Sequence, residues 1–191
     1  MGILEPERTD AGPHPRREPR FDGPLTLKRL EQIFQDCVDF TKRPVSLGEG
    51  GACTLTLCYL SGMVKMERVS DYVLRPLAQD EALARCGTPR QAMEEMMGGA
   101  LYNLSAAERT TLDEAAFDLV AGWCLMFFPG ESAVLSLFVG TEEKRSISSP
   151  SNETVLKGSR DAFVESLRTN TSIVRRHLKT PELRIREQVV G

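Results

Sequence analysis

The chain has 191 residues, of which 41% are hydrophobic and 27% charged, a composition typical of a globular protein. No apolar run approaches the roughly 20 residues of a membrane helix, and residues 1–20 lack the apolar core of a signal peptide. Five cysteines without a Cys-x-x-Cys pair and only two histidines, His14 and His177, leave little material for a disulfide scaffold, a zinc module or histidine-dependent catalysis. We therefore expect a soluble intracellular protein that is not an enzyme.

The net charge of −3 is unevenly distributed along the chain. Residues 66–143 hold five basic and thirteen acidic residues, whereas residues 144–186 hold ten basic and four acidic ones. This polarity predicts two parts with different surfaces that face each other or different partners, although solvated helix faces of opposite sign would give the same pattern. The basic part contains one aromatic residue, Phe163, which argues against a nucleic-acid partner.

The first half of the chain alternates between predicted helices and a strand. Residues 1–22 form a proline- and charge-rich tail that we expect to be disordered. Apolar residues at steps of three and four predict a helix over Pro24–Thr41, ended by Lys42-Arg43-Pro44. Strict alternation predicts a strand over Ala52–Leu60, and Met66–Leu74 is predicted as a short helix broken by Pro76.

Two capping boxes, which begin at Thr88 and Thr111, open the next predicted helices. The first helix directs three methionines to the core, and Gly122 closes the second. Two bulky apolar runs separated by Pro-Gly-Glu-Ser predict a hairpin. The hairpin strands are Trp123–Phe128 and Ala133–Val139, and two further short strands are expected at Ala100–Ser105 and Lys144–Ile147. The three methionines of the first helix are Met93, Met96 and Met97.

This order predicts an α/β fold with a layered mixed sheet and flanking helices over residues 23–147. Residues 148–158 have no periodic pattern and are predicted to be a linker. A helix over Arg160–Lys179 and a strand over Leu183–Val190 follow. Because a helix and one strand cannot enclose a core, residues 159–191 are interpreted as an incomplete second α/β subdomain, whose free strand edge pairs with another chain or folds back on the first sheet.

The helix over Arg160–Lys179 has two contrasting faces. Its apolar stripe, which we expect to be buried, consists of Phe163, Leu167, Thr171, Val174 and Leu178, while the arginines point elsewhere.

No motif predicts catalysis, a metal site or a cofactor. Gly48-Glu49-Gly50-Gly51 precedes a strand and not a helix, so it is more consistent with a turn than with phosphate binding. Cys53 and Cys58 lie on opposite faces of their strand, which disfavours a shared metal. Pairs of adjacent carboxylates on helices diverge and are interpreted as surface.

Three segments carry a resemblance to a known family. Residues 152–165 read Asn-Glu-Thr-Val-Leu-Lys-Gly-Ser-Arg-Asp-Ala-Phe-Val-Glu, and Leu-Arg-Thr-Asn (167–170) and Arg-Arg-His-Leu-Lys-Thr-Pro (175–181) follow. Residues 59–64 and 69–77 read Tyr-Leu-Ser-Gly-Met-Val and Val-Ser-Asp-Tyr-Val-Leu-Arg-Pro-Leu, and residues 36–40 read Asp-Cys-Val-Asp-Phe. These segments span roughly residues 25–190, and in their sequence and their order along the chain they resemble the A subunit of GerA-type spore germinant receptors. Ser159, Ala162 and His177 depart from the family pattern, where proline, glycine and arginine are usual.

The resemblance implies an extramembrane N-terminal region ahead of transmembrane helices that this sequence does not contain. The region would be a non-enzymatic module of nutrient-triggered germination on the core side of the spore inner membrane. It would contact B- and C-type receptor subunits and other A-subunit copies, without a cofactor. The alternative is a domain that binds a small-molecule germinant in a cleft between two subdomains.

Within this resemblance, eight polar residues are the candidate hinge and interface. Three lie where the predicted linker meets the helix, and the helix supplies the others, whose arginines could dock on the acidic first subdomain or on a neighbouring copy. The alternative is that these arginines only solvate the helix and complement its dipole. The candidates are Asn152, Glu153, Arg160, Glu165, Arg168, Asn170, Arg175 and Arg176.

Overall fold

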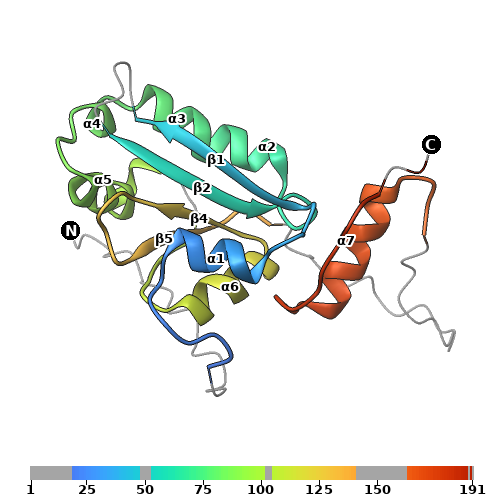
Figure 1. Cartoon of the computed structure of the whole chain (residues 1–191). Helices are drawn as coiled ribbons and strands as arrows, with labels where there is room; N and C mark the ends of the chain where they lie inside the picture. The colour runs from blue at the N-terminus through green and yellow to red at the C-terminus, as the bar shows by residue number, and fades with distance from the viewer. Residues whose placement is uncertain (1–18, 48–52, 102–104, 141–162, 189, 191) are drawn as a thin grey trace, which may run out of the picture.

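The computed structural model describes residues 19–47, 53–101, 105–140, 163–188 and 190. At its centre lies a five-stranded sheet with the order β1-β2-β4-β5-β3 (Figure 1). The strands are β1 (Phe40–Ser46), β2 (Thr54–Leu60), β3 (Ala106–Arg109), β4 (Trp123–Phe127) and β5 (Val134–Phe138). The predicted α/β class with helices flanking a sheet is confirmed. All pairings between these strands are antiparallel, whereas a mixed sheet needs at least one parallel pair.

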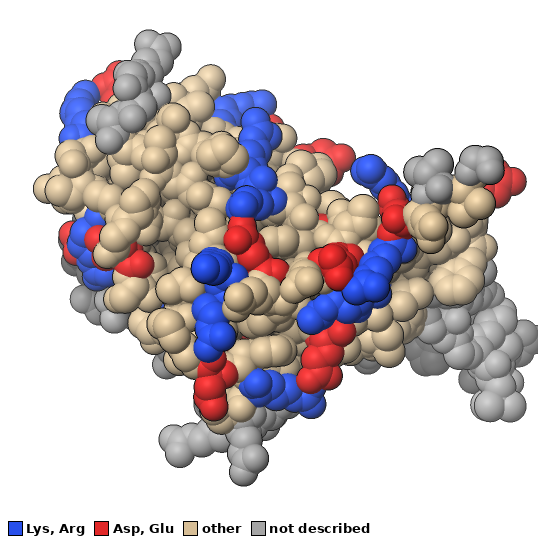
Figure 2. Space-filling model, viewed as in Figure 1, with Lys and Arg blue, Asp and Glu red and all other residues tan. Residues whose placement is uncertain are grey.

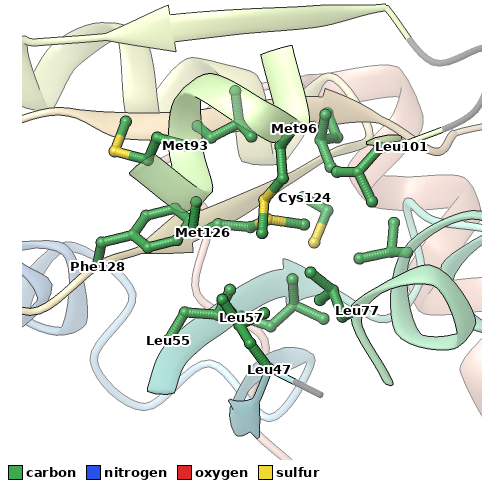
Figure 3. Packing of buried hydrophobic residues seen from close by; sticks show 14 of the residues in the cluster. Leu47, Leu55, Leu57, Leu77, Met93, Met96, Leu101, Cys124, Met126 and Phe128 are labelled. Atoms are coloured by element: carbon green, nitrogen blue, oxygen red, sulfur yellow. The ribbon is translucent and has the colours of Figure 1, made fainter. Parts of the chain in front are cut away.

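One face of the sheet is covered by a series of short helical segments (Figure 1). Leucines of β2 and β5 pack there against Val73, Met93 and Met96, and Figure 3 shows the two methionines beside Met126 and Cys124 of β4. Met97, expected in the same core, is 46% exposed. The segments are α2 (Met66–Arg68), π-helical η1 (Val69–Leu74), α3 (Arg75–Gln79), α4 (Glu81–Ala84), α5 (Pro89–Glu95) and π-helical η2 (Met96–Ala100).

The opposite face packs against α1 (Leu27–Ile33) and α6 (Leu112–Val120). The alternation predicted for β2 is confirmed, because Leu55 and Leu57 enter the first core whereas Cys58 and Leu60 enter the second. The threonine caps predicted for α5 and α6 are also present, since Thr88 and Thr111 accept hydrogen bonds from the third helical N–H. Burial on both faces therefore follows the period-2 pattern of the strands.

The predicted helix over Pro24–Thr41 is shorter than expected. α1 ends at Ile33, and Asp36 adopts a left-handed conformation with φ of 62°, which stops helix propagation. Strand β1 follows and includes Lys42-Arg43-Pro44, which the sequence pattern had assigned to a helix end. Proline is tolerated because β1 is an edge strand, where a missing N–H can face away from the ladder.

Two further element boundaries differ from expectation. Pro76 does not end the helix. A proline ring disrupts i→i−4 hydrogen bonding, but the turn before Pro76 is π-helical and uses i→i−5 bonds, such as the one from Arg75 N–H to the Ser70 carbonyl. The short strand predicted at Ala100–Ser105 is wrong for its described residues, because Ala100 ends η2 and neither Leu101 nor Ser105 lies in a strand. The four-residue strand β3 begins directly after it, at Ala106. The predicted strand at Lys144–Ile147 and the predicted linker lie outside the described residues.

The C-terminal part consists of α7 (Leu167–Leu178) and an extended segment after it. Figure 1 shows α7 beside the end of the sheet, standing apart from the helices that cover its faces. The predicted strand over Leu183–Val190 is wrong for the described residues 183–188, since they join no ladder. None of the helices in the described ranges is long and apolar enough to cross a bilayer.

Gly122, between α6 and β4, generates a first prediction. Its φ of 89° disfavours a side chain, and a Cβ there would lie 2.9 Å from the carbonyl oxygen of Met63. We expect Gly122→Ala to lower the free energy of unfolding by about 1–3 kcal/mol, measured by urea denaturation. Gly98→Ala is the control, because a Cβ at Gly98 meets no atom within 4 Å, and an equal loss in both variants would contradict the prediction.

Cys58 of β2 generates a second prediction, on alkaline stability. Burial raises the pKa of its thiol from 9.0 to about 12, since the thiolate is poorly solvated in the core. The unfolded chain therefore loses this proton first, so the contribution of Cys58 to stability is fully present below about pH 9 and is lost between about pH 9 and 12. Cys58→Ala should reduce this fall by up to about 1.4 kcal/mol per pH unit, measured by denaturation at pH 8 and above.

Candidate interaction site at the base of helix α7

Local interactions fix both ends of α7. Ser166 caps the N-terminus by accepting the N–H of Thr169, and Lys179 ends the helix in a left-handed conformation with its N–H on the carbonyl of Arg175. Basic side chains in the last turn complement the negative end of the helix dipole. The helix is therefore defined by its own sequence, and its position relative to the sheet depends on other contacts.

The main polar contact between α7 and the sheet is an ion pair between Arg175 and Asp39. Arg175 Nε donates to Asp39 Oδ2 at 2.5 Å and Nη2 donates to Oδ1 at 2.9 Å, a two-pronged geometry that only arginine offers. The Arg175 side chain is fully buried and Asp39 is 8% exposed. Nη2 also approaches the carbonyl oxygen of Leu183 at 3.4 Å. The pair therefore lies out of water and joins α7 to the residue that precedes β1.

The extended segment after α7 adds a second set of contacts to the turn between α1 and β1. Val38 N–H donates to the carbonyl of Ile185 at 2.9 Å, and the thiol of Cys37 approaches the carbonyl of Leu183 at 3.5 Å. Arg186 pairs with Asp36 at 2.6 Å on the exposed side. Residues 183–186 thus fold back on the first subdomain, and they contact this turn without extending the sheet.

A close approach completes the docking of α7. A Cβ on Gly62 would lie 2.6 Å from Ser172 Oγ and 3.3 Å from Ser172 Cα, so a larger residue would require the Ser172 side chain or the helix to shift. Neither of the two core clusters of the described chain includes a residue of α7. Polar contacts and close backbone packing therefore hold the helix in this position.

The eight predicted site residues have different environments. Asn152, Glu153 and Arg160 lie outside the described residues, whereas Arg175 is in the ion pair. Arg176 is half-buried and donates to the carbonyl of Ser172 in its own helix. Glu165 and Arg168 are exposed, and no described carboxylate lies within an ion-pair distance of Arg168. The structure therefore brings together Arg175 and Asp39 and leaves Arg168 open to solvent.

Asn170 has a local role. Its side chain accepts the N–H of Val164 at 2.8 Å and donates to the Val164 carbonyl at 2.7 Å. The amide thus pairs with both backbone groups of one residue and orders the approach to α7. Both polar atoms of the Asn170 side chain, Oδ1 and Nδ2, are therefore hydrogen-bonded within its own segment.

The orientation of α7 differs from the expected one. Of the stripe predicted to be buried, Leu167 and Leu178 are 60% and 56% exposed and Thr171 and Val174 are half-buried. The fully buried residue is Arg175, which was predicted to point elsewhere. The periodicity identified an amphipathic helix correctly, but it could not reveal a polar counterpart on the sheet domain. Figure 2 shows the outer part of α7 as mostly uncharged, while charged side chains gather between it and the body.

Two functional carboxylates were missed, Asp36 and Asp39. Both were assigned to a helix that ends before them, so their role in holding a distant segment was hidden. No local signal marked them, because β1, which follows Asp39 directly, is polar and mostly exposed. A second buried network was also missed, in which Asp118 accepts from Ser136 at 2.7 Å and from Arg109 at 2.8 Å, with Arg109 above the Trp123 ring.

The arrangement offers contact surfaces and no reactive centre in the described part of the chain. No group of three or more potential metal ligands occurs there. Burial raises the pKa of the Cys53, Cys58 and Cys124 thiols, which makes them poor nucleophiles. A shallow hollow of about 500 Å³ lies beside the ion pair, lined by Asp36, Cys37, Val38, Arg186 and Glu187.

Comparison with known proteins places this fold in a family. Residues 28–191 match the family model described as Bacillus/Clostridium GerA spore germination protein. The chain is 32% identical over 165 residues to the uncharacterized membrane protein YfkQ of Bacillus subtilis (strain 168), covering 86% of this chain and 31% of that protein. It is 28% identical over 181 residues to spore germination protein KA of the same organism, covering 92% and 32%. The chain thus spans about a third of the length of these relatives.

A solved structure shares the fold. The crystal structure of the N-terminal domain of the A subunit of the Bacillus megaterium spore germinant receptor GerK3 superposes with a TM-score of 0.62 at 21% identity. The match covers 81% of this chain and 54% of that domain. At this identity the comparison establishes the architecture.

The ion pair generates a third prediction. Arg175→Leu leaves the Asp39 carboxylate buried without a partner, so we expect the free energy of unfolding to fall by about 3–5 kcal/mol. Arg186→Leu, at the exposed pair with Asp36, should cost only about 0–1 kcal/mol and serves as the control. Adding Asp39→Leu to Arg175→Leu should recover much of the loss, because the unpaired charge is removed. Denaturant unfolding measures all four proteins, and equal losses at Arg175 and Arg186 would contradict the prediction.

Proposed function

Because the chain belongs to the GerA spore germination protein family, we propose that it is the N-terminal domain of the A subunit of a spore germinant receptor. Its role is germination signalling and receptor assembly, and it has no enzymatic activity. The shared fold with the corresponding domain of GerK3 and the resemblance of spore germination proteins over most of the chain support this assignment. None of these relatives carries the name of an enzyme.

The observation that carries the proposed mechanism is the buried pair of Arg175 and Asp39. A helix fixed by a desolvated, two-pronged contact cannot slide by small steps, because any displacement exposes an unpaired charge. The helix and the sheet domain therefore move together or separate completely. Such two-state behaviour suits a module that passes a conformational change from one receptor part to another.

The partners and location follow from the same assignment. We propose that the domain contacts B- and C-type subunits and further A-subunit copies, on the core side of the spore inner membrane. Arg168 supports a docking role, since its guanidinium is exposed on α7 and free of described carboxylates. Asn152, Glu153 and Arg160 remain the proposed hinge ahead of the helix.

Germinant binding between subdomains is the alternative function. The hollow beside the ion pair is open, and two of its five lining residues, Asp36 and Arg186, already pair with each other. A ligand would have to break this pair or leave it unused, so the geometry favours assembly. Calorimetry with amino acids, sugars and nucleosides tests the alternative, and we expect no heat of binding.

A fourth prediction tests the proposed function in spores of the native host. Arg168→Glu reverses an exposed charge without touching the core, so the melting temperature of the purified chain should change by no more than about 2 °C. Nutrient-triggered germination should nevertheless be slowed, because the docking face of α7 is altered. Germination is followed by the loss of optical density after nutrient addition.

The matched control is Arg85→Glu, which makes the same charge change at the C-cap of α4, where the side chain is 76% exposed and pairs with the exposed Glu81. It should leave germination normal. Normal germination with Arg168→Glu would exclude this arginine from the docking face. Normal nutrient response in spores that lack the gene altogether would overturn the receptor assignment itself.

A further inference from the structure

The turn that follows β2, residues 61–65, contacts both α7 and the residue that holds it. The turn lies at the end of the sheet beside which α7 stands (Figure 1). Ser61 N–H donates to the backbone carbonyl of Asp39 at 2.9 Å, and the carboxylate of Asp39 binds Arg175. Gly62 packs so closely on the helix that a Cβ there would lie 3.3 Å from Ser172 Cα. One side of the turn therefore adjoins the ion pair and the helix itself.

The other side of the same turn holds the chain after β5. Val64 forms an isolated antiparallel bridge with Gly140, and Lys65 N–H donates to the carbonyl of Val139 at 3.0 Å. Arg68, the last residue of α2, donates to the carbonyl of Gly140 at 3.0 Å. Gly140 is the last described residue before residues 141–162, which include the predicted linker. The described sheet domain therefore ends at the turn on which α7 docks.

The two sides of the turn are connected by close packing. A Cβ on Gly122 would lie 2.9 Å from the carbonyl oxygen of Met63 and 3.1 Å from Gly140 Cα, so backbone packs directly on backbone at this point. Met63 belongs to the core on one face of the sheet and Val64 to the core on the other. Because close-packed interiors are hardly compressible, they transmit a displacement from one side to the other.

From these contacts we propose that residues 61–65, which we call the relay turn, couple the docking of α7 to the pairing of Gly140. While Arg175 holds the helix in place, α7 supports the relay turn at Gly62, and Val64 of the turn holds Gly140. When the helix separates, the turn loses its support on one side and the contacts at Gly140 weaken. The position of α7 is thereby passed to the residue that precedes residues 141–162.

This coupling deepens the proposed signalling role and rests on that role for its biological meaning. Within the role, the relay turn is the route by which the position of α7 affects the chain after Gly140. The coupling is tested on the purified 191-residue chain, so its failure would leave the receptor assignment in place. Conversely, failure of the germination experiments would not bear on the coupling.

A coupling of this kind acts in both directions. If the docking of α7 stabilises the contacts at Gly140, weakening these contacts must loosen α7 by the same free energy. Two backbone amides report the two sides of the relay turn. Val38 N–H bonds the carbonyl of Ile185 in the segment after α7, and Lys65 N–H bonds the carbonyl of Val139.

The fifth prediction is that loss of the ion pair affects Lys65. In Arg175→Leu, amide hydrogen exchange at Lys65 should accelerate about five- to fiftyfold relative to exchange at Leu125. Leu125 reports global unfolding, because it is paired on both sides in the central strand β4. Arg186→Leu is the control and should leave the ratio unchanged, since the pair of Arg186 with Asp36 is exposed and involves no residue of the relay turn. Exchange is followed by NMR.

The reverse experiment perturbs the other side of the relay turn. Arg68→Met removes the donor to the Gly140 carbonyl without changing α7, and it should accelerate exchange at Val38 by a similar factor relative to Leu125. Arg75→Met is the matched control, because Arg75 pairs with Asp71 at an exposed site in the same series of helical segments. Exchange at Val38 should be unchanged in this control.

Each experiment can overturn the proposal. Exchange at Lys65 that accelerates no more than at Leu125 in Arg175→Leu would show that the docking of α7 has no effect beyond the ion pair. Exchange at Val38 that is unchanged in Arg68→Met would also contradict the coupling, because a free-energy coupling is reciprocal. A control that changes its reporter as much as the test variant would assign the effect to general destabilisation. If Arg175→Leu does not fold, the experiment with Arg68→Met decides alone.

Discussion

The buried ion pair between Arg175 and Asp39 determines how the C-terminal part of the chain is attached to the sheet. Neither core cluster of the described residues contains a residue of α7, so this contact replaces the apolar packing that usually joins a helix to its domain. Its desolvation offsets much of its Coulombic energy. We infer that the pair mainly specifies one position and orientation for α7. Arg175 Nη1 is buried without an acceptor, which destabilises the docked state and lowers the free energy needed to separate the guanidinium from Asp39.

This attachment explains why α7 carries its apolar residues outside. Docking through an arginine directs a polar side chain of the helix inward and leaves Leu167 and Leu178 exposed. The segment after the helix supports the same orientation, because its backbone bonds Val38 and its Arg186 pairs with Asp36.

Sequence reasoning identified the elements that depend on local pattern. The alternation in β2, the hairpin of β4 and β5 and the threonine caps of α5 and α6 are properties of neighbouring residues. It failed where distant contacts decide. β1 was hidden by Pro44, which only an edge position permits, and Arg175 resembled a solvated residue until Asp39 was placed beside it. The buried partner of a charge cannot be read from periodicity, because the two residues lie far apart in the chain.

The separation of these two residues has a consequence for synthesis. Arg175 and Asp39 are 136 positions apart, so a chain that emerges at about 5–20 residues per second exposes Asp39 for several seconds before its partner leaves the ribosome. The sheet, which is complete at Phe138, can form during that interval with a hydrated carboxylate at its edge. Docking of α7 would then be a late step of cotranslational folding, and a ribosome that pauses beyond the last strand would hold a folded sheet whose place for the helix is still open.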